Sequence, residues 1–133
     1  RVSVGKAGTE TPTGTWTMHR AGRWQELMGP SWGQYGTHVV NGIFVHSVAC
    51  GQANSYNLPV GEYLRLGNPA SHGCIRACVA DAKWVWDNCN GSKIRIFDGT
   101  YTSNEALKGP LGRKALTPLR GSKNFDPTDP ACK

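Results

Sequence analysis

Long apolar runs and clustered positive charge are both missing from this 133-residue chain. No apolar stretch approaches the roughly 20 residues that a membrane-spanning helix needs, so we expect no membrane span. No run of Lys and Arg reaches five residues, and the 15 basic residues are scattered, which argues against a nucleic-acid partner. The net charge of +6 therefore indicates a soluble basic protein, or one that works in an anionic setting such as a membrane surface or an acidic cell wall.

Metal-binding patterns are missing as well. The chain has no Cys-x-x-Cys pair and no histidines at the spacing of a zinc site, so we predict no metal and no cofactor. It contains no internal repeat or low-complexity tract, and its length suits one domain rather than two. The chain starts with Arg1 and shows no signal peptide, so we expect a mature product or an excised fragment.

The five cysteines make an odd count. If one of them is a free nucleophile, the other four can form two disulfides in an oxidising compartment, or none: Cys50, Cys78, Cys89 and Cys132. If Cys78 and Cys89 share one helix, about 16 Å of axial rise separates them. A disulfide tolerates only about 7 Å between Cα atoms, so any bridge must use Cys50 or Cys132. The pairing itself stays open.

Seventeen Gly and eight Pro make the chain rich in turns, which favours β-structure with many loops. We expect short strands at residues 2–5, 15–18 and 93–97, and a buried strand at residues 39–46. We expect loops at residues 20–37 and 48–65. In the first loop, the aromatic side chains either pack against the domain or form a wall of a groove. One stripe of side chains has helical spacing: Cys78, Ala82, Val85, Trp86 and Cys89.

These elements predict a mainly β fold, a twisted sandwich or open barrel, with one helix following Cys74. We expect a catalytic domain over residues 1–100. Residues 101–133 contain four prolines and should form a partly irregular extension that packs on the domain or trails from it, with a short helix near residues 103–108.

The most informative stretch is Ser71-His72-Gly73-Cys74-Ile75-Arg76. A cysteine attacks as a thiolate, and a nearby imidazole can take its proton. His72 lies two residues before Cys74, and His46 ends the apolar run upstream, so the residues alone leave both open as the base. Because Cys74 precedes the predicted helix, backbone amides there can lower the thiol pKa and hold an oxyanion. Arg76 can clamp a substrate carboxylate, or form a structural ion pair with an acid such as Asp81.

Residues 66–76 resemble the signature of the L,D-transpeptidase (YkuD-like) catalytic domain, which carries Ser/Thr-His-Gly-Cys after an upstream histidine. Two further stretches are similar to the family: Thr11-Pro12-Thr13-Gly14-Thr15 near the domain start, and Asp81-Ala82 after the cysteine. Two features depart from the pattern. The gap between His46 and Cys74 is long, so residues 48–65 look like an insertion, and only ten residues precede Thr11 where the family has opening strands.

The resemblance implies roles for individual residues. Cys74 would be the nucleophile, His46 the base, and the Ser47 position would orient that base. The amides of His72, Gly73 and Cys74 would form the oxyanion hole. Beside these roles, the residues themselves suggest Ser71, Arg76 and Tyr35 as substrate-binding candidates, with packing in the core as the alternative for Tyr35.

The resemblance also implies a function: a secreted enzyme of the bacterial cell wall that supports cell shape by cross-linking peptidoglycan. Cys74 would form a thioester with a stem tetrapeptide, D-Ala would leave, and an acceptor amine would resolve the thioester. Carbapenem-type β-lactams would acylate Cys74. Two alternatives stay open: an L,D-carboxypeptidase in which water resolves the same thioester, and a non-catalytic module that binds the wall.

Overall fold

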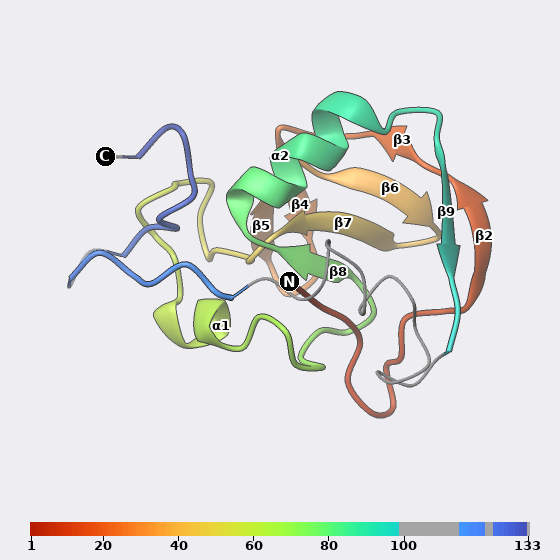
Figure 1. Ribbon diagram of the computed structural model, residues 1–133, viewed down its shortest axis with the longest axis horizontal. Coiled ribbons are helices and arrows are strands. Elements are labelled where there is room, and N and C mark those ends of the chain that lie inside the picture. Colours follow the sequence, from red (N-terminus) through yellow and green to blue (C-terminus); the bar gives the residue numbers. More distant parts are fainter. Residues whose placement is uncertain (99–114, 122–123, 133) are drawn as a thin grey trace.

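A computed structural model describes residues 1–98, 115–121 and 124–132 (Figure 1). In chain order its elements are β1 (Val2–Ser3), β2 (Gly14–Thr17), β3 (His19–Arg20), β4 (Trp24–Leu27), β5 (Ser31–Gln34), β6 (Thr37–Val40), β7 (Ile43–Ser47), α1 (Val60–Leu64), β8 (Ile75–Ala77), α2 (Val79–Asn88) and β9 (Lys93–Ile96). The fold is mainly β, as the sequence predicts. None of the helices in these described ranges has both the length and the apolar character to cross a membrane.

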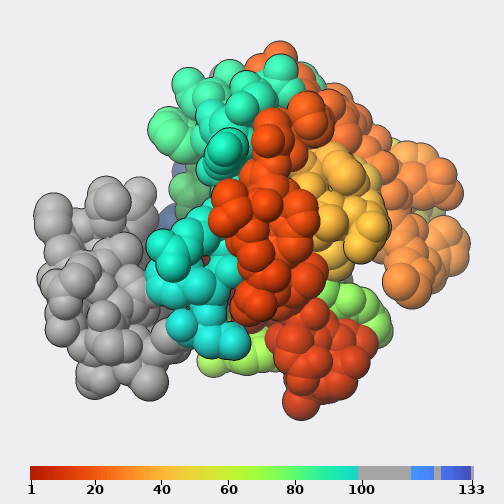
Figure 2. All heavy atoms as spheres, turned by 90° about the vertical axis from the view of Figure 1, so that its right-hand side faces the viewer, coloured from red at the N-terminus to blue at the C-terminus, as the bar shows by residue number. Residues whose placement is uncertain are grey.

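A five-stranded sheet with the order β1-β8-β7-β6-β3 forms the centre of the molecule. β7 and β8 are parallel, whereas the other pairs in this sheet are antiparallel. β2 pairs with β9, and β4 pairs with β5, in two separate two-stranded sheets. Figure 2 shows the β2–β9 pair on one face of the molecule, and residues of the β4–β5 hairpin, in orange, projecting at its side.

Apolar side chains gather in three clusters around the central sheet. The first joins the sheet to β2, β9 and α2, and its buried members are Met18, Val39 and Val45. The second joins Tyr35 to α2 and includes Ala77, Val79 and Ala82. The third surrounds α1 and consists of Val48, Leu58, Tyr63 and Leu66, with Leu116 and Leu119 packed against it. Residues far beyond the last strand therefore contribute to the core.

Two elements differ from the prediction. Residues 39–46 are not one strand, because the chain reverses at Asn41-Gly42 between β6 and β7, with Asn41 at a φ of 50°. An Asn-Gly pair between β-branched residues is a strong hairpin signal, which the apolar character of the run obscured. Residues 20–37 are not a loop but contain the β4–β5 hairpin, which turns at Gly29 with a φ of 100°.

The helix after Cys74 forms, but it begins later than predicted. β8 intervenes, and α2 starts at Val79 with Cys78 as its N-cap, so Cys74 does not lie at a helix N-terminus. Residues 48–65, predicted as a loop, contain the short helix α1. The short helix predicted near residues 103–108 falls outside the described residues. All five cysteines are free thiols in the structure.

Candidate active site

The parallel pairing of β7 and β8 brings the predicted base and nucleophile together. The register aligns His46 with Arg76 and Val45 with Ile75. Because side chains alternate along a strand, Val45 and Ile75 enter the core, while His46 and Arg76 face the other side with Cys74. On that side lies a cavity of about 300 Å³, lined by Glu26, Leu27, Met28, Ser31, Gly42, Phe44, His46, Ala49, Ser71, His72, Cys74 and Arg76.

The Cys74 thiol lies half-buried in this cavity. The backbone amide of Phe44 donates a hydrogen bond to its sulfur at 3.4 Å. The thiol in turn donates a hydrogen bond to the Gly42 carbonyl at 3.6 Å. Burial raises the pKa of the Cys74 thiol, and the Phe44 amide and the charge of Arg76 oppose this only in part. The sequence-based expectation of a lowered thiol pKa is therefore wrong for this structure, in which β8 separates Cys74 from the start of α2.

His46 is buried, with only 2% of its surface exposed. Its Nδ1 donates to the carbonyl of Ser47, which makes Nδ1 the protonated nitrogen and leaves the Nε2 lone pair free to accept a proton. Desolvation lowers the pKa of His46 to about 4; the bond to Ser47 opposes this and the charge of Arg76 adds to it. The imidazole is therefore neutral at pH 7 and can act as a base. The Ser47 position contacts the base through its backbone, not its hydroxyl.

β5 covers His46 closely. A Cβ added at Gly33 would lie 2.7 Å from His46 Nδ1, so only glycine fits this position without a shift of the ring. The next residue, Gln34, donates its amide to Ser47 Oγ at 2.8 Å. Gly33 and Gln34 were not predicted as site residues, because nothing in the local pattern shows that a hairpin stacks on His46.

The nucleophile loop is held by its own serine and by the start of the chain. Ser71 Oγ donates to the Cys74 carbonyl at 2.6 Å and accepts from the Gly73 amide at 3.1 Å. Thr11 Oγ1 donates to the Gly73 carbonyl at 2.7 Å, so two of the three stretches that resemble the family meet in space. Because the Gly73 amide is engaged, the amides of His72 and Cys74 are the better candidates to bind an oxyanion.

Two of the predicted substrate-binding residues have other contacts. Arg76 forms an ion pair with Glu62 of α1 at 2.9 Å, not with Asp81, although it also lines the cavity. Tyr35 is absent from the cavity wall. Its ring is buried, packs edge-on against Trp86 with 5.5 Å between the centroids, and lies under the guanidinium of Arg23. The structure therefore does not place Tyr35 where it could contact substrate.

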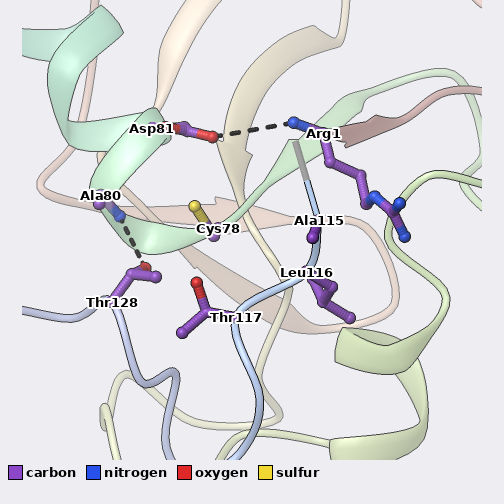
Figure 3. Close-up of a pocket in the computed structure, with 8 residues that line it drawn as sticks. All are labelled: Arg1, Cys78, Ala80, Asp81, Ala115, Leu116, Thr117 and Thr128. Atoms are coloured by element: carbon purple, nitrogen blue, oxygen red, sulfur yellow. Dashed lines mark hydrogen bonds and ion pairs between the residues drawn. The ribbon is translucent and has the colours of Figure 1, made fainter. Parts of the chain in front are cut away.

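A second, smaller cavity of about 150 Å³ lies at the start of α2. Figure 3 shows the residues that line it. Its wall includes Cys78 and Asp81, and Asp81 lies 4.0 Å from the amino group of Arg1. Burial raises the pKa of the Cys78 thiol. No histidine is among the described residues that line this cavity, whereas the cavity of Cys74 contains His46 and His72.

The chain is also similar to known proteins in sequence and in fold. The family model of YkuD, the L,D-transpeptidase catalytic domain, matches residues 1–114. A stretch of 27 residues is 59% identical to the putative L,D-transpeptidase YciB of Bacillus subtilis strain 168 and covers 20% of this chain and 14% of that protein.

Two solved structures from Mycobacterium tuberculosis are similar in fold. An L,D-transpeptidase of strain H37Rv matches with a TM-score of 0.57 and 23% identity, over 73% of this chain and 42% of that one. L,D-transpeptidase 3 in complex with a faropenem-derived adduct matches with a TM-score of 0.51 and 22% identity, over 73% and 43%. This chain thus spans less than half of each.

Proposed function

This chain belongs to the L,D-transpeptidase catalytic-domain family, and from that premise we propose that it cross-links peptidoglycan through an acyl-enzyme on Cys74. The observation that carries the proposal is the pairing of β7 with β8, which places a neutral, oriented imidazole and a thiol in one cavity. The enzyme would act outside the cytoplasm, on the bacterial cell wall, and needs neither metal nor nucleotide for this chemistry.

In the first half-reaction, Cys74 Sγ attacks the carbonyl carbon of the third residue in a donor tetrapeptide. Because burial disfavours both the thiolate and the imidazolium, His46 Nε2 takes the thiol proton as the S–C bond forms, not before. The amides of His72 and Cys74 bind the developing oxyanion. As the C–N bond breaks, His46 returns the proton to the nitrogen of the departing D-Ala, leaving a thioester.

In the second half-reaction, an acceptor amine attacks the thioester carbonyl. His46 accepts a proton from the amine and delivers it to the sulfur, which restores the thiol and releases the cross-linked product. Water in place of the amine would make the enzyme an L,D-carboxypeptidase. A half-buried thiol that shares a cavity with an oriented imidazole favours either enzymatic function over a module that only binds the wall.

β-Lactams of the carbapenem type should acylate the same sulfur, because opening the lactam ring follows the same path as attack on the donor. The mycobacterial L,D-transpeptidase 3 noted above is in complex with a faropenem-derived adduct. For this chain we expect a covalent adduct on Cys74, with ring opening and no loss of a leaving group.

The decisive experiment incubates the protein with a purified disaccharide tetrapeptide and follows products by mass spectrometry. We expect cross-linked dimers from the wild type and from Cys89→Ala, the matched control, because Cys89 lies half-buried at the C-terminal end of α2. Cys74→Ala should give none. Tripeptide without dimers would indicate the carboxypeptidase, and dimers from Cys74→Ala would overturn the proposal.

A further inference from the structure

Residues 124–132, here called the strap, carry two buried carboxylates that bind different parts of the domain. Asp126 and Asp129 are only 2% and 3% exposed. Asp126 Oδ2 accepts the amide of Val79 at 2.8 Å, at the start of α2. Asp129 Oδ2 accepts from Gln34 Nε2 at 2.9 Å, at the end of β5. One short segment therefore binds both the helix that follows the nucleophile strand and the strand that covers the base.

Both polar atoms of the Gln34 side chain form hydrogen bonds, one of them with Asp129. While Nε2 of Gln34 donates to Asp129, its Oε1 accepts from Arg23 at 2.9 Å. Gln34 is itself 3% exposed, so a lost partner would leave a polar group buried without a hydrogen bond. Asp129 is held in turn, because its Oδ1 accepts the amide of Ala131 at 2.9 Å.

Gln34 and its neighbour Gly33 contact the residues that surround and orient His46. The backbone amide of Gln34 donates to Ser47 Oγ, and Gly33, its neighbour, lies against the ring of His46. The carbonyl of Ser47 accepts from His46 Nδ1. A shift of Gln34 would therefore move both the surface that covers the imidazole and the residue that orients it.

We propose that Asp129 is a positioning residue for the catalytic base, acting through Gln34 to hold β5 and Ser47 around His46. The strap lies beyond residue 114, where the family model ends, so this role adds to the site that the family match covers. The inference rests on the proposed function for its kinetic readout, but its structural readout does not depend on activity.

The structural readout is the imidazole itself. In NMR spectra of the ¹⁵N-labelled protein, Asp129→Ala should broaden or shift the His46 Nδ1–H resonance and weaken the Nδ1–H tautomer. Asp126→Ala is the matched control: it removes a buried carboxylate from the same strap, but one that binds α2 instead of β5. It should leave the His46 signals in place. Asp129→Asn, which keeps one acceptor oxygen, should give an intermediate result.

The kinetic readout is the rate at which the carbapenem imipenem acylates Cys74, followed by mass spectrometry at a temperature where every variant is folded. We expect Asp129→Ala to slow the maximal acylation rate roughly tenfold with little change in the concentration at half-saturation, because the base is misaligned and the cavity is intact. Asp126→Ala should acylate at the wild-type rate.

Two results would overturn the inference: unchanged His46 signals in Asp129→Ala, or equal slowing in the Asp126 and Asp129 variants, which would mean that the strap only stabilises the fold. Failure of the proposed function looks different. In that case the wild type itself is not acylated, while the NMR comparison still tests whether Asp129 positions His46.

Discussion

His46 and Cys74 are both uncharged at neutral pH, because burial lowers the pKa of the imidazole to about 4 and raises that of the thiol. A preformed thiolate would make the rate depend on the thiol pKa. In the proposed mechanism the proton moves during the attack, so the rate would depend on how well the imidazole is aimed at the sulfur. The side chains that hold the ring are therefore as important as the pair itself.

Gly33→Ala tests this dependence on alignment. The added Cβ would lie 2.7 Å from His46 Nδ1, so the ring or β5 must move. We expect at least a tenfold lower rate of carbapenem acylation, with a loss of about 1–3 kcal/mol in the free energy of unfolding from overpacking. Mass spectrometry gives the rate, and urea titration gives the stability.

Gly61→Ala is the control, since an added Cβ there meets no atom within 4 Å. It should acylate normally. If Gly33→Ala reacted as fast as Gly61→Ala, close packing on the imidazole would not matter for the chemistry.

Glu26 is the acidic side chain that reaches the cavity wall without a counter-charge. Among the described residues it forms no ion pair, whereas Arg76 is paired with Glu62. In the proposed reaction the acceptor would arrive as an ammonium ion, which this carboxylate would attract before the amine loses its proton. Glu26→Gln should lower the ratio of cross-linked dimer to hydrolysed tripeptide about fivefold, equivalent to about 1 kcal/mol for an exposed charge pair.

The ratio is read by mass spectrometry at several acceptor concentrations. Asp87→Asn removes an exposed acid from α2 and should not change it. An unchanged ratio in Glu26→Gln as well would show that this carboxylate does not select the acceptor.

At the scale of elements, α2 shows how the distant strap completes a helix. Its N-cap residue, Cys78, makes no side-chain cap bond, and the Asp126 carboxylate accepts the Val79 amide instead. The same carboxylate accepts from the amide and the hydroxyl of Thr128. An acid at this end also complements the helix dipole.

Asp126→Ala should therefore lower the free energy of unfolding by about 2 kcal/mol, measured by urea denaturation, because a buried amide at the start of α2 loses its acceptor. Asp98→Ala, at an exposed position, should change it by less than about 0.5 kcal/mol. Equal effects of the two substitutions would mean that α2 does not depend on this cap.

The elements that were predicted correctly are those whose own residues carry a periodic pattern of apolar side chains. The helical stripe gave α2, and alternation gave β9. The Ser-His-Gly-Cys stretch singled out Cys74, which lines the same cavity as His46. His46, not His72, is the buried imidazole with a hydrogen bond that orients it. The β4–β5 hairpin was not predicted. It packs on β7, and such a contact between distant residues leaves no periodic pattern in the local sequence.

At the scale of the whole molecule, the buried imidazole makes stability depend on pH. The folded pKa of His46 is about 4, against about 6.5 in the unfolded chain. Between these values the unfolded state binds more protons, so the free energy of unfolding falls as the pH drops. The slope reaches about 1.4 kcal/mol per pH unit, and the total loss from this group is about 3 kcal/mol.

Urea titrations at pH 7.0, 5.5 and 4.5 measure this loss. His46→Asn should reduce the dependence on pH, whereas His19→Asn, at an exposed position, should retain it. The same slope in all three proteins would mean that His46 is not neutral and buried in the folded state.

The parallel pairing of β7 with β8 also affects how the protein matures. Residues 48–74 must leave the sheet, pass through α1 and return alongside β7 before Cys74 reaches His46. Such non-local pairing forms late, because the entropy of closing the loop is lost before the contacts are gained. In the proposed mechanism, a chain still emerging from the ribosome would therefore carry an ordinary cysteine, and Cys74 would acquire its base only when the sheet has closed.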